Sequence, residues 1–465
     1  MFVAVVAAGV AVAVVLTNGS TSSAVEHPSE WDPRIEPLAE LVSEERGLDW
    51  AHPVAVRFEP EDAFVDEVVD EDAELSDEAR EDLENAQREM EALSLLPEGV
   101  DLQAAIDETA STSILAFYSY ESEEIVVRGE DLDVNRRATL AHELTHALQD
   151  QHFDLEALQT EAEEQGNEGG VLAVIEGDAG RIEDEYVSSL PAEERAEYEQ
   201  GSSDVATEAA ESLRAADVPE VMDVLFGYPY ALGPPFVDIV LAAEGNDAVD
   251  DLFRPDVTEA DVLIPVRYLD GGEPTAPAVP DVPSDAEETH APEGFGAINW
   301  YFMLAARLDP GTALAAVDGW DGDVAVGYQE DETSCVAAAF IGQTSSDTER
   351  MAVALEAWSA AGPSGAADVE RQAGEVVLRA CEAESAPGPT RSLRDALVAA
   401  ATRSTVFEEF LGPAPTREVA WCTANELAFD PELSAIFASP KEPDAATQAF
   451  ITTRVQAAAR RCLIA

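Results

Sequence analysis

Residues 132–149 read LDVNRRATLAHELTHALQ, and the second half of this stretch decides how the rest of the chain is interpreted. Leucine and alanine at positions 140, 144, 147 and 148 recur at helical spacing, which predicts an α-helix with one apolar face. His142, Glu143 and His146 form an HExxH motif on this helix. Residues four apart share a helix face, so the two imidazoles can bind one metal ion. Glu143 can reach a water bound to that ion as a general base.

The metal that this motif favours is zinc. Zn²⁺ takes neutral imidazole ligands and lowers the pKa of its bound water to about 7, which makes a hydroxide nucleophile at neutral pH. Random placement of so few histidines would produce an HExxH pattern only about once in a hundred such chains, which disfavours a helix with two incidental surface histidines. The six histidines of the chain are His27, His52, His142, His146, His152 and His290.

Strands are predicted upstream of the motif. Two β-rich runs at 114–120 and 125–128 are separated by the polar residues 121–124, a pattern typical of a hairpin. A further strand is predicted at 54–58, and a long acidic helix over 76–96 with Ser76 as its N-cap. A strand pair beside the metal helix would offer an edge to which an extended peptide can add as another strand.

A zinc site needs a third protein ligand, and two residues compete for this role. His152 lies six residues after His146, the spacing of the pattern HExxHxxGxxH, but Gln149 stands where that pattern has the glycine that turns the chain. Glu176 lies on a second apolar helical run, 171–179, which follows a glycine-rich break at 166–170. Glu176 is favoured, because glutamine adopts the required turn less readily than glycine.

Other residues are candidates for supporting roles. Asp150 and Asp178 can orient a ligand imidazole through its second nitrogen. Tyr228 and Tyr230 can each donate a hydrogen bond to a developing oxyanion, although packing is the commoner role for a tyrosine. His290 lies in a proline-rich segment that can approach the site, whereas a single histidine in a loop is more often simply exposed.

The segments 140–153 (LAHELTHALQDQHF) and 175–179 (IEGDA) resemble bacterial and archaeal zinc metallopeptidases of the gluzincin type. Further similarity lies in 226–233 (FGYPYALG) and 319–323 (GWDGD), so the resemblance covers the middle of the chain, 50–330. It implies a zincin fold and peptide-bond hydrolysis, with His142, His146 and Glu176 as zinc ligands and Glu143 as general base. Gly180 departs from the family pattern, because gluzincins often carry a histidine-orienting residue at that position, four after the glutamate ligand.

The charge balance disfavours several classes of partner. The chain has 96 acidic and 25 basic residues, a formal net charge of −71, and a single lysine, Lys441. Nucleic-acid binding and docking on anionic lipid both need a basic patch, and none is visible in the sequence. An acidic, hydrated surface suits about 1 M salt, where a Debye length of about 3 Å screens self-repulsion. We therefore expect a halophilic or salt-tolerant source.

Both ends of the chain indicate a location outside the cytoplasm. Residues 2–16 are apolar and uncharged and precede a Ser/Thr-rich spacer, which predicts an export signal or a single N-terminal membrane anchor. The four cysteines are expected to form two disulfides, Cys335–Cys381 and Cys422–Cys462. Disulfides persist in oxidising compartments, so the expected location is extracellular or on the cell surface.

The predicted fold class is α+β. Residues 1–30 would form the export signal or anchor with its spacer. Residues 31–270 would form a zincin-like metallopeptidase domain with a small sheet, the HExxH helix and the helix of Glu176, followed by a helical part over 201–250. Residues 271–294, rich in proline and acid, would be a linker or a loop over the active site, and residues 295–465 a C-terminal α+β region with the disulfides. The expected function is zinc-dependent hydrolysis of a peptide or protein substrate. The alternative is a non-catalytic cell-envelope interaction protein on a zincin-like scaffold.

Overall fold

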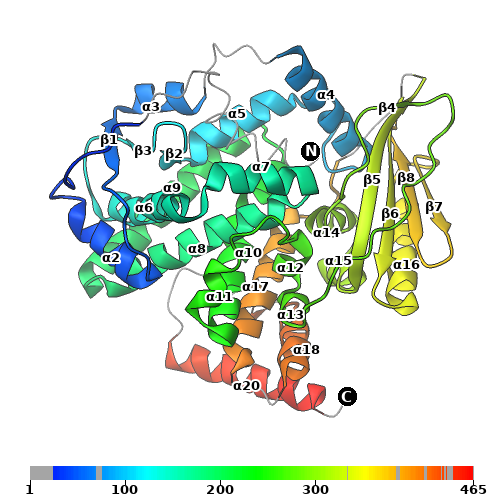
Figure 1. The fold of residues 1–465 in the computed structure, drawn as a ribbon. Coiled ribbons are helices and arrows are strands. Elements are labelled where there is room, and N and C mark those ends of the chain that lie inside the picture. The colour runs from blue at the N-terminus through cyan, green and yellow to red at the C-terminus, as the bar shows by residue number, and fades with distance from the viewer. Residues whose placement is uncertain are drawn as a thin grey trace.

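The fold is mixed α+β, as predicted, with helices lying between and around two small sheets (Figure 1). The computed structural model describes residues 25–69, 76–331, 333–383, 388–412, 416–430, 432–433, 436 and 444–463. The apolar run predicted to be an export signal or anchor, residues 2–16, lies outside these ranges.

The elements in chain order are as follows. The helices are α2 (Glu36–Arg46), α3 (Glu61–Val68), α4 (Asp77–Ala92), α5 (Leu102–Ser113), α6 (Val134–Phe153), α7 (Leu155–Gln165), α8 (Glu168–Ser189), α9 (Ala192–Ala215), α10 (Glu220–Glu244), α11 (Asn246–Asp250), α12 (Glu259–Leu263), α13 (Pro265–Leu269), α14 (Ala297–Ala305), α15 (Pro310–Val317), α16 (Ser345–Ala361), α17 (Leu393–Leu411), α18 (Arg417–Leu427) and α20 (Ala445–Cys462). The strands are β1 (Ala55–Glu59), β2 (Ala116–Ser119), β3 (Glu124–Arg128), β4 (Glu287–Glu288), β5 (Trp320–Glu330), β6 (Thr333–Gly342), β7 (Ala367–Arg371) and β8 (Val376–Cys381).

The smaller sheet contains the predicted strand and hairpin. Its strand order is β1-β3-β2. β2 and β3 pair antiparallel, as the hairpin pattern predicts, and β1 adds in parallel on the other side of β3. Ile125 and Val127 on β3 pack into one buried cluster with the leucines of α6. β2 therefore lies at an edge of this sheet, beside the HExxH helix.

α6, the predicted HExxH helix, begins and ends at aspartates. The carboxylate of Asp133 accepts a hydrogen bond from the backbone N–H of Arg136 at 2.9 Å, a typical N-cap. Asp154 follows the last turn with a left-handed backbone (φ 51°), and its side chain caps the start of α7. α8, which carries Glu176, then packs against both α6 and α7.

The glycine-rich break predicted before α8 has two different uses. Gly166 ends α7 with a left-handed backbone (φ 70°), as helix C-caps often do. Gly169 and Gly170 instead lie in the first turn of α8. A Cβ on Gly170 would lie 2.2 Å from the carbonyl oxygen of Val257, so glycine here lets α8 approach the chain just ahead of α12.

Glycines also set the distance between α8 and α10. A Cβ on Gly177, which follows Glu176, would lie 2.4 Å from the carbonyl carbon of Gly233. A Cβ on Gly233 would in turn lie 2.2 Å from the carbonyl oxygen of Ala173. Because backbone atoms cannot rotate aside as side chains can, both positions require glycine at this helix crossing.

Replacing Gly177 with alanine is expected to lower the free energy of unfolding by about 1–3 kcal/mol, because the added methyl group must push α8 and α10 apart. Gly227→Ala on α10 is the matched control. Its Cβ would meet only a methyl of Leu397 at 3.7 Å, an ordinary contact. Alanine has the higher helix propensity, so the control should be neutral or stabilising by up to about 1 kcal/mol. Denaturant unfolding compares the three proteins, and a Gly177→Ala chain as stable as the wild type would contradict this close approach.

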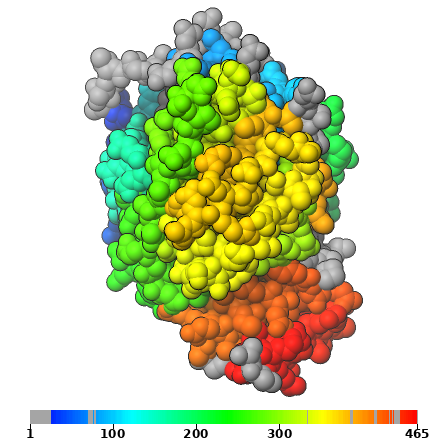
Figure 2. All heavy atoms as spheres, turned by 90° about the vertical axis from the view of Figure 1, so that its right-hand side faces the viewer, coloured from blue at the N-terminus to red at the C-terminus, as the bar shows by residue number. Residues whose placement is uncertain are grey.

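The larger sheet has five strands in the order β4-β5-β6-β8-β7, and every pair is antiparallel. α16 packs against β6, β7 and β8. Figure 2 looks onto this side of the molecule, with the C-terminal helices gathered at its lower end. Both predicted cysteine pairs are confirmed. Cys335 and Cys381 face each other across β6 and β8, and the bond between Cys422 and Cys462 joins α18 to α20.

Segment 271–294, expected to be a linker or a loop over the site, instead runs along β5. Thr275 N donates to the carbonyl of Asp321, and Thr289 N to that of Gly327. β4, within this segment, pairs directly with β5. The segment thus completes the larger sheet through backbone hydrogen bonds, which a proline-rich composition alone does not reveal.

The hydrophobic core continues across the predicted boundary at 271–294. One buried cluster joins α8 and α10 to α14, the larger sheet and α17, and a second joins α2, the smaller sheet and α6. α8 belongs to both, because Val174 and Ile175 pack in the first cluster and Ile182 and Tyr186 in the second. Glu176 lies between these two groups. The division into separate domains stays a prediction.

α10 is the one helix among the described residues that is long and apolar enough to cross a membrane. Of its most apolar window, 61% is buried inside the fold, and Pro229, Pro234 and Pro235 lie within the helix. Such burial is expected of a core helix, so α10 adds nothing to the prediction of an N-terminal anchor.

Candidate metal centre

Two helices bring the predicted ligands together. His142 and His146 lie one turn apart on α6, and Glu176 lies on α8. Glu176 Oε2 is 3.1 Å from His142 Nε2 and 3.4 Å from His146 Nε2, and all three side chains are largely buried. In a tetrahedral zinc site with bonds of about 2.0–2.1 Å, neighbouring donor atoms are about 3.4 Å apart. The longer distance matches this spacing, the shorter one is also that of a direct hydrogen bond, and all three donor atoms lie within 4.8 Å of one another.

Hydrogen bonds determine which ring nitrogen of His146 carries hydrogen. His146 Nδ1 lies 3.1 Å from Gln149 Oε1. The Nε2 amide of Gln149 donates to the carbonyl of Ile175 at 3.1 Å and to the carboxylate of Asp178 at 3.0 Å. Oε1 of Gln149 is thus the acceptor that faces His146. His146 Nδ1 must donate, which leaves the lone pair of its Nε2 facing Glu176.

Glu183 lies beside the other ring nitrogen of His142 at an ion-pair distance, without a well-formed hydrogen bond. Its Oε2 lies 3.4 Å from His142 Nδ1 and favours a hydrogen on that nitrogen, and its Oε1 accepts a hydrogen bond from the hydroxyl of Tyr198. The lone pair of His142 Nε2 then also faces Glu176. Two imidazole lone pairs and a carboxylate oxygen are all acceptors, so they need a proton or a cation between them. The residues present fit a bound metal cation.

A buried network of charges holds Gln149 in place. Asp178 is fully buried and accepts hydrogen bonds from Arg46 Nε at 2.7 Å, from Arg181 Nη2 at 3.0 Å and from Gln149. Arg46 reaches in from the end of α2 and pairs as well with Asp250 on α11, at 2.7 Å. Asp178, predicted to orient a histidine, therefore reaches His146 through Gln149 and not directly.

Electrostatics in the centre favour a positive charge among the donors. Burial alone would lower the pKa of both His142 and His146, but the carboxylates around them outweigh burial, chiefly Glu176, and raise both values. Burial would raise the pKa of Glu176, yet the two imidazoles hold it well below its usual range. A cation bound between the three groups would replace the proton that this arrangement favours.

Glu143 and Tyr230 border the three donors. Glu143 is 6% exposed, and burial raises the pKa of its carboxyl group. Tyr230 on α10 is 55% exposed, and its ring is stacked on that of His142 with the ring centroids 6.0 Å apart. Loss of solvation around its hydroxyl, together with the charges of Glu176 and Glu143, raises the pKa of Tyr230 well above its usual value. Tyr230 thus stays a neutral donor at the opening of the centre.

The two other tyrosines near the centre differ in role. Tyr228, a candidate oxyanion donor in the sequence, is fully buried, and its hydroxyl donates to the carbonyl of Gly169 at 3.3 Å. Packing is therefore its role, the commoner one for a tyrosine. Tyr120, at the end of β2, was not predicted. Burial first, and then the charges of Glu176, Asp150 and Glu143, raise the pKa of Tyr120, and its ring packs edge-on against Tyr118.

His152 and Asp150 have their hydrogen-bond partners outside the metal centre. His152 is exposed, and its Nε2 lies 2.9 Å from the carbonyl oxygen of Asp49. Asp150 accepts hydrogen bonds from the hydroxyl of Tyr118 at 3.0 Å and from Leu155 N at 2.9 Å. The physical reason is that α6 continues to Phe153 without the turn that a glycine at position 149 would allow. The geometry therefore favours Glu176 over His152 as third ligand.

His290 lies just after β4, against β5 of the larger sheet, and is not exposed. Its side chain is 12% exposed, and its Nε2 lies 3.1 Å from Glu89 Oε1 on α4. Burial would lower the pKa of His290, but the hydrogen bond and charge of Glu89 outweigh burial and raise it to about 9.

This ion pair makes stability depend on pH. The pKa of His290 is raised from 6.5 to about 9 on folding, so its stabilising contribution is fully present below pH 6.5 and is lost as pH rises through 9. Between these limits the wild type is expected to lose about 2–3 kcal/mol of unfolding free energy relative to a His290→Gln variant. Denaturant unfolding at several pH values measures this difference. Parallel pH profiles for the two proteins would contradict the pairing.

Glu183 is a residue that the sequence can indicate in retrospect. It lies seven residues after Glu176, two helical turns along α8, and therefore on the same helix face. Gly180 occupies the position one turn earlier, where the orienting residue was sought. Glu183 lies one helical turn beyond position 180, and its side chain is long enough to reach the imidazole of His142 from there.

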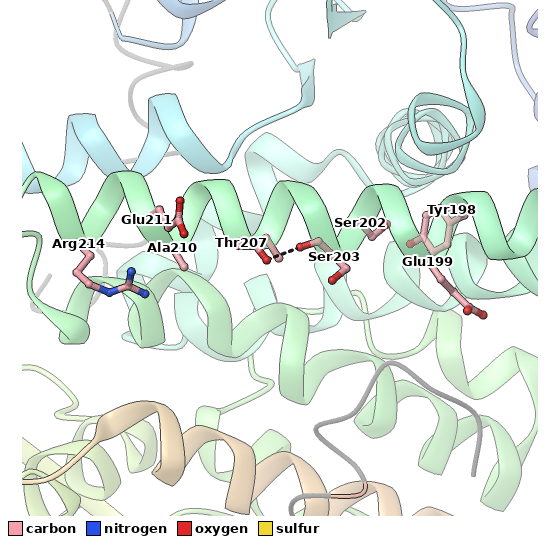
Figure 3. A pocket seen from close by; sticks show the side chains of 9 residues that line it. Tyr198, Glu199, Ser202, Ser203, Thr207, Ala210, Glu211 and Arg214 are labelled. Atoms are coloured by element: carbon pink, nitrogen blue, oxygen red, sulfur yellow. Dashed lines mark hydrogen bonds between the residues drawn. The ribbon is translucent and has the colours of Figure 1, made fainter. Parts of the chain in front are cut away.

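A pocket of about 610 Å³ lies along one face of α9 (Figure 3). It is lined by nine residues of that helix, from Tyr198 to Arg214, and none of them is a predicted ligand. Tyr198 connects the pocket to the centre, because its hydroxyl donates to Glu183 at 3.1 Å.

Among the described residues, two further groups of ligating side chains lie close together. Cys422 and Cys462 gather with Glu426, but the two cysteines are bonded to each other and offer no thiolate. The second group contains His27, His52 and Glu123. Comparison of the chain with protein-family models, with curated proteins and with solved structures found no match. Function must therefore be inferred from the sites themselves.

Proposed function

We propose that this chain is a zinc-dependent peptidase on a zincin-like scaffold, with His142, His146 and Glu176 as zinc ligands and Glu143 as general base. The observation that carries the proposal is the convergence of two Nε2 lone pairs and one carboxylate oxygen in a buried site beside Glu143. Zinc bound there would supply Lewis acidity and a water with a pKa of about 7.

The residues of the chain would then act on water and substrate. Glu143 would take a proton from the attacking water and hand it to the leaving amine, a role that suits a buried carboxylate with a raised pKa. Tyr230 would donate its phenolic hydrogen to the oxygen that gains charge, because its ring stacks on that of His142 and its raised pKa keeps the hydroxyl protonated. Glu183 and Gln149 would keep both imidazoles in the orientation that exposes Nε2.

The surroundings suit an extended peptide. β2 is an edge strand, and Tyr120, which follows it, packs against the buried cluster that contains the leucines of α6. An extended substrate can add to such an edge through backbone hydrogen bonds, which hold any sequence in a fixed register. The two disulfides agree with an oxidising, extracellular or cell-surface location. The strongly acidic surface leads us to propose high salt as the working condition.

The test is hydrolysis of a mixed peptide library by the full chain, loaded with zinc and kept at about 1 M salt to screen its acidic surface. We expect cleavage that a chelator abolishes and added zinc restores. His152→Ala is the matched control and should cleave as the wild type does. Zinc binding without any cleavage would favour the alternative, a non-catalytic cell-envelope interaction protein. Cleavage that survives the chelator would contradict a metal-dependent mechanism.

A further inference from the structure

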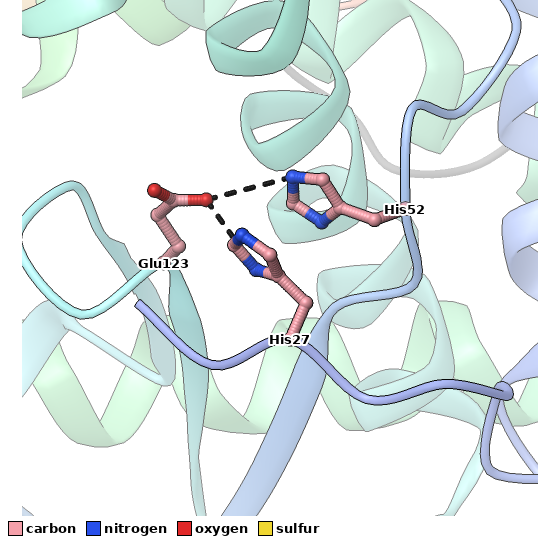
Figure 4. Close-up of side chains that lie close together, drawn as sticks. All are labelled: His27, His52 and Glu123. Carbon is pink, nitrogen blue, oxygen red and sulfur yellow. Dashed lines mark ion pairs between the residues drawn. The ribbon is translucent and has the colours of Figure 1, made fainter. Parts of the chain in front are cut away.

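We propose that His27, His52 and Glu123 form a second transition-metal site, which clamps the chain ahead of α2 to the turn of the β2–β3 hairpin. Figure 4 shows the three side chains converging from separate segments. His27 lies ahead of α2, His52 in the loop before β1, and Glu123 in the hairpin turn. Their donor atoms all lie within 4.8 Å of one another.

The distances suit a bridging cation better than direct hydrogen bonds. Glu123 Oε2 lies 3.6 Å from His27 Nδ1 and 3.6 Å from His52 Nε2. A hydrogen bond from either imidazole would bring nitrogen and oxygen to about 2.7–3.2 Å. Donor atoms around a tetrahedral zinc ion are instead about 3.4 Å apart. One carboxylate oxygen equidistant from two ring nitrogens is therefore the arrangement expected around one ion.

The second ring nitrogen of His52 is already engaged. His52 Nδ1 lies 3.2 Å from the carbonyl oxygen of Pro53, which can only accept, and 3.4 Å from the Nε2 amide of Gln151; the shorter contact favours a hydrogen on this nitrogen. Gln151 on α6 fixes the same loop, because it donates to the carbonyl of His52 at 3.1 Å and accepts from Ala51 N at 2.8 Å. The Nε2 lone pair of His52 thus faces a carboxylate oxygen, and two acceptors in that position need a cation between them.

Composition adds a separate reason. The chain has six histidines, and two of them stack here with ring centroids 3.5 Å apart, although 25 residues separate them in the sequence. The side chains of His27, His52 and Glu123 are 29%, 26% and 29% exposed, so an ion can enter from solvent. A net charge of −71 raises the local concentration of cations around this surface.

The ligand set selects the class of metal. Two imidazoles and one carboxylate suit zinc and neighbouring first-row transition metals, whereas calcium and magnesium prefer oxygen ligands only. We expect this metal to have a structural role. Glu123 lies in the β2–β3 turn, three residues after Tyr120, so a metal bound to it would restrain that turn. A metal here would hold the hairpin turn next to the HExxH helix. It would also tie the chain ahead of α2 to the hairpin, next to the contact between Trp31 and Trp50. The proposal is independent of peptidase activity.

Zinc binding by the full chain tests this site once the HExxH site has been removed by His142→Ala and His146→Ala. The assay contains high salt and an excess of Mg²⁺ and Ca²⁺, so that these ions and not zinc occupy the surface carboxylates. We expect this variant to bind about one zinc per chain. Adding His52→Ala or Glu123→Gln should lower the affinity at least about tenfold, whereas adding His152→Ala, another exposed histidine, should leave it unchanged.

Absence of zinc from the parent variant, when its circular dichroism matches that of the wild type, would overturn the proposal. Zinc binding that neither His52→Ala nor Glu123→Gln weakens would also overturn it, because the ion would then sit on surface carboxylates. If the parent variant does not fold, the same comparison is made in the wild type, where His52→Ala should lower the zinc content from about two to about one per chain. Failure of the HExxH proposal is recognised separately, as equal zinc content with and without His142 and His146.

Discussion

Replacing Glu143 with glutamine is expected to lower kcat for peptide hydrolysis by about 10²–10⁴-fold while the zinc content stays that of the wild type. Glutamine matches glutamate in shape but cannot take a proton from the attacking water. Glu143 is buried beside the three proposed ligands and is not itself among the converging donors, so the substitution should leave them in place.

The matched control is Glu164→Gln on α7, which makes the same chemical change at an exposed glutamate. Its kcat should equal that of the wild type. Peptide-cleavage kinetics and metal analysis on the same preparations give both readouts. Full activity of the Glu143→Gln chain would contradict its role as base, and loss of zinc from that chain would make Glu143 a ligand instead.

Replacing Asp178 with alanine is expected to lower the free energy of unfolding by about 3–5 kcal/mol. Asp178 is fully buried and pairs with both Arg46 and Arg181. Its removal takes away the carboxylate that these two buried guanidinium groups share. Gln149 would lose one of its two acceptors and hold His146 less firmly. Zinc affinity should therefore fall as well, by about 10–100-fold, as for other residues that orient a ligand.

Asp32→Ala is the control for a surface ion pair, because Asp32 pairs with Arg34 where both side chains are well exposed. Its effect on the free energy of unfolding should be below about 1 kcal/mol. Denaturant unfolding and zinc titration of the three proteins test the two expectations. An Asp178→Ala chain with wild-type stability would show that the buried network is not needed for folding.

Periodicity and capping patterns predicted most elements around the centre. The HExxH helix, the hairpin and the acidic helix with Ser76 at its N-cap are all present, because each carries its signal within a few consecutive residues. The two cysteine pairs were also predicted. Glu176 was favoured as third ligand because position 149 holds glutamine where the competing pattern has glycine. This argument also depends on a few consecutive residues.

Long-range partners could not be predicted in the same way. Arg46 contacts Asp178 across 132 positions of the chain, and His27 and His52 meet only because the chain ahead of α2 folds back. The pairing of segment 271–294 with β5 depends on backbone hydrogen bonds that proline content obscures. In the sequence, Gly177 and Gly233 resemble ordinary helix-breaking residues. Only the packing of α8 on α10 shows that the close approach of the two helices requires glycine at both positions. Contacts of this kind are set by tertiary packing, which local patterns do not encode.

The most direct test of the central claim is the zinc content of four chains, purified without a histidine tag in high salt. All carry His52→Ala, so that only the HExxH centre is counted. The parent, Glu143→Gln and His152→Ala chains are expected to hold about one zinc each, and Glu176→Ala none. Zinc retained in the Glu176→Ala chain but lost from the His152→Ala chain would contradict the account, as would a parent chain that binds no zinc after incubation with the metal.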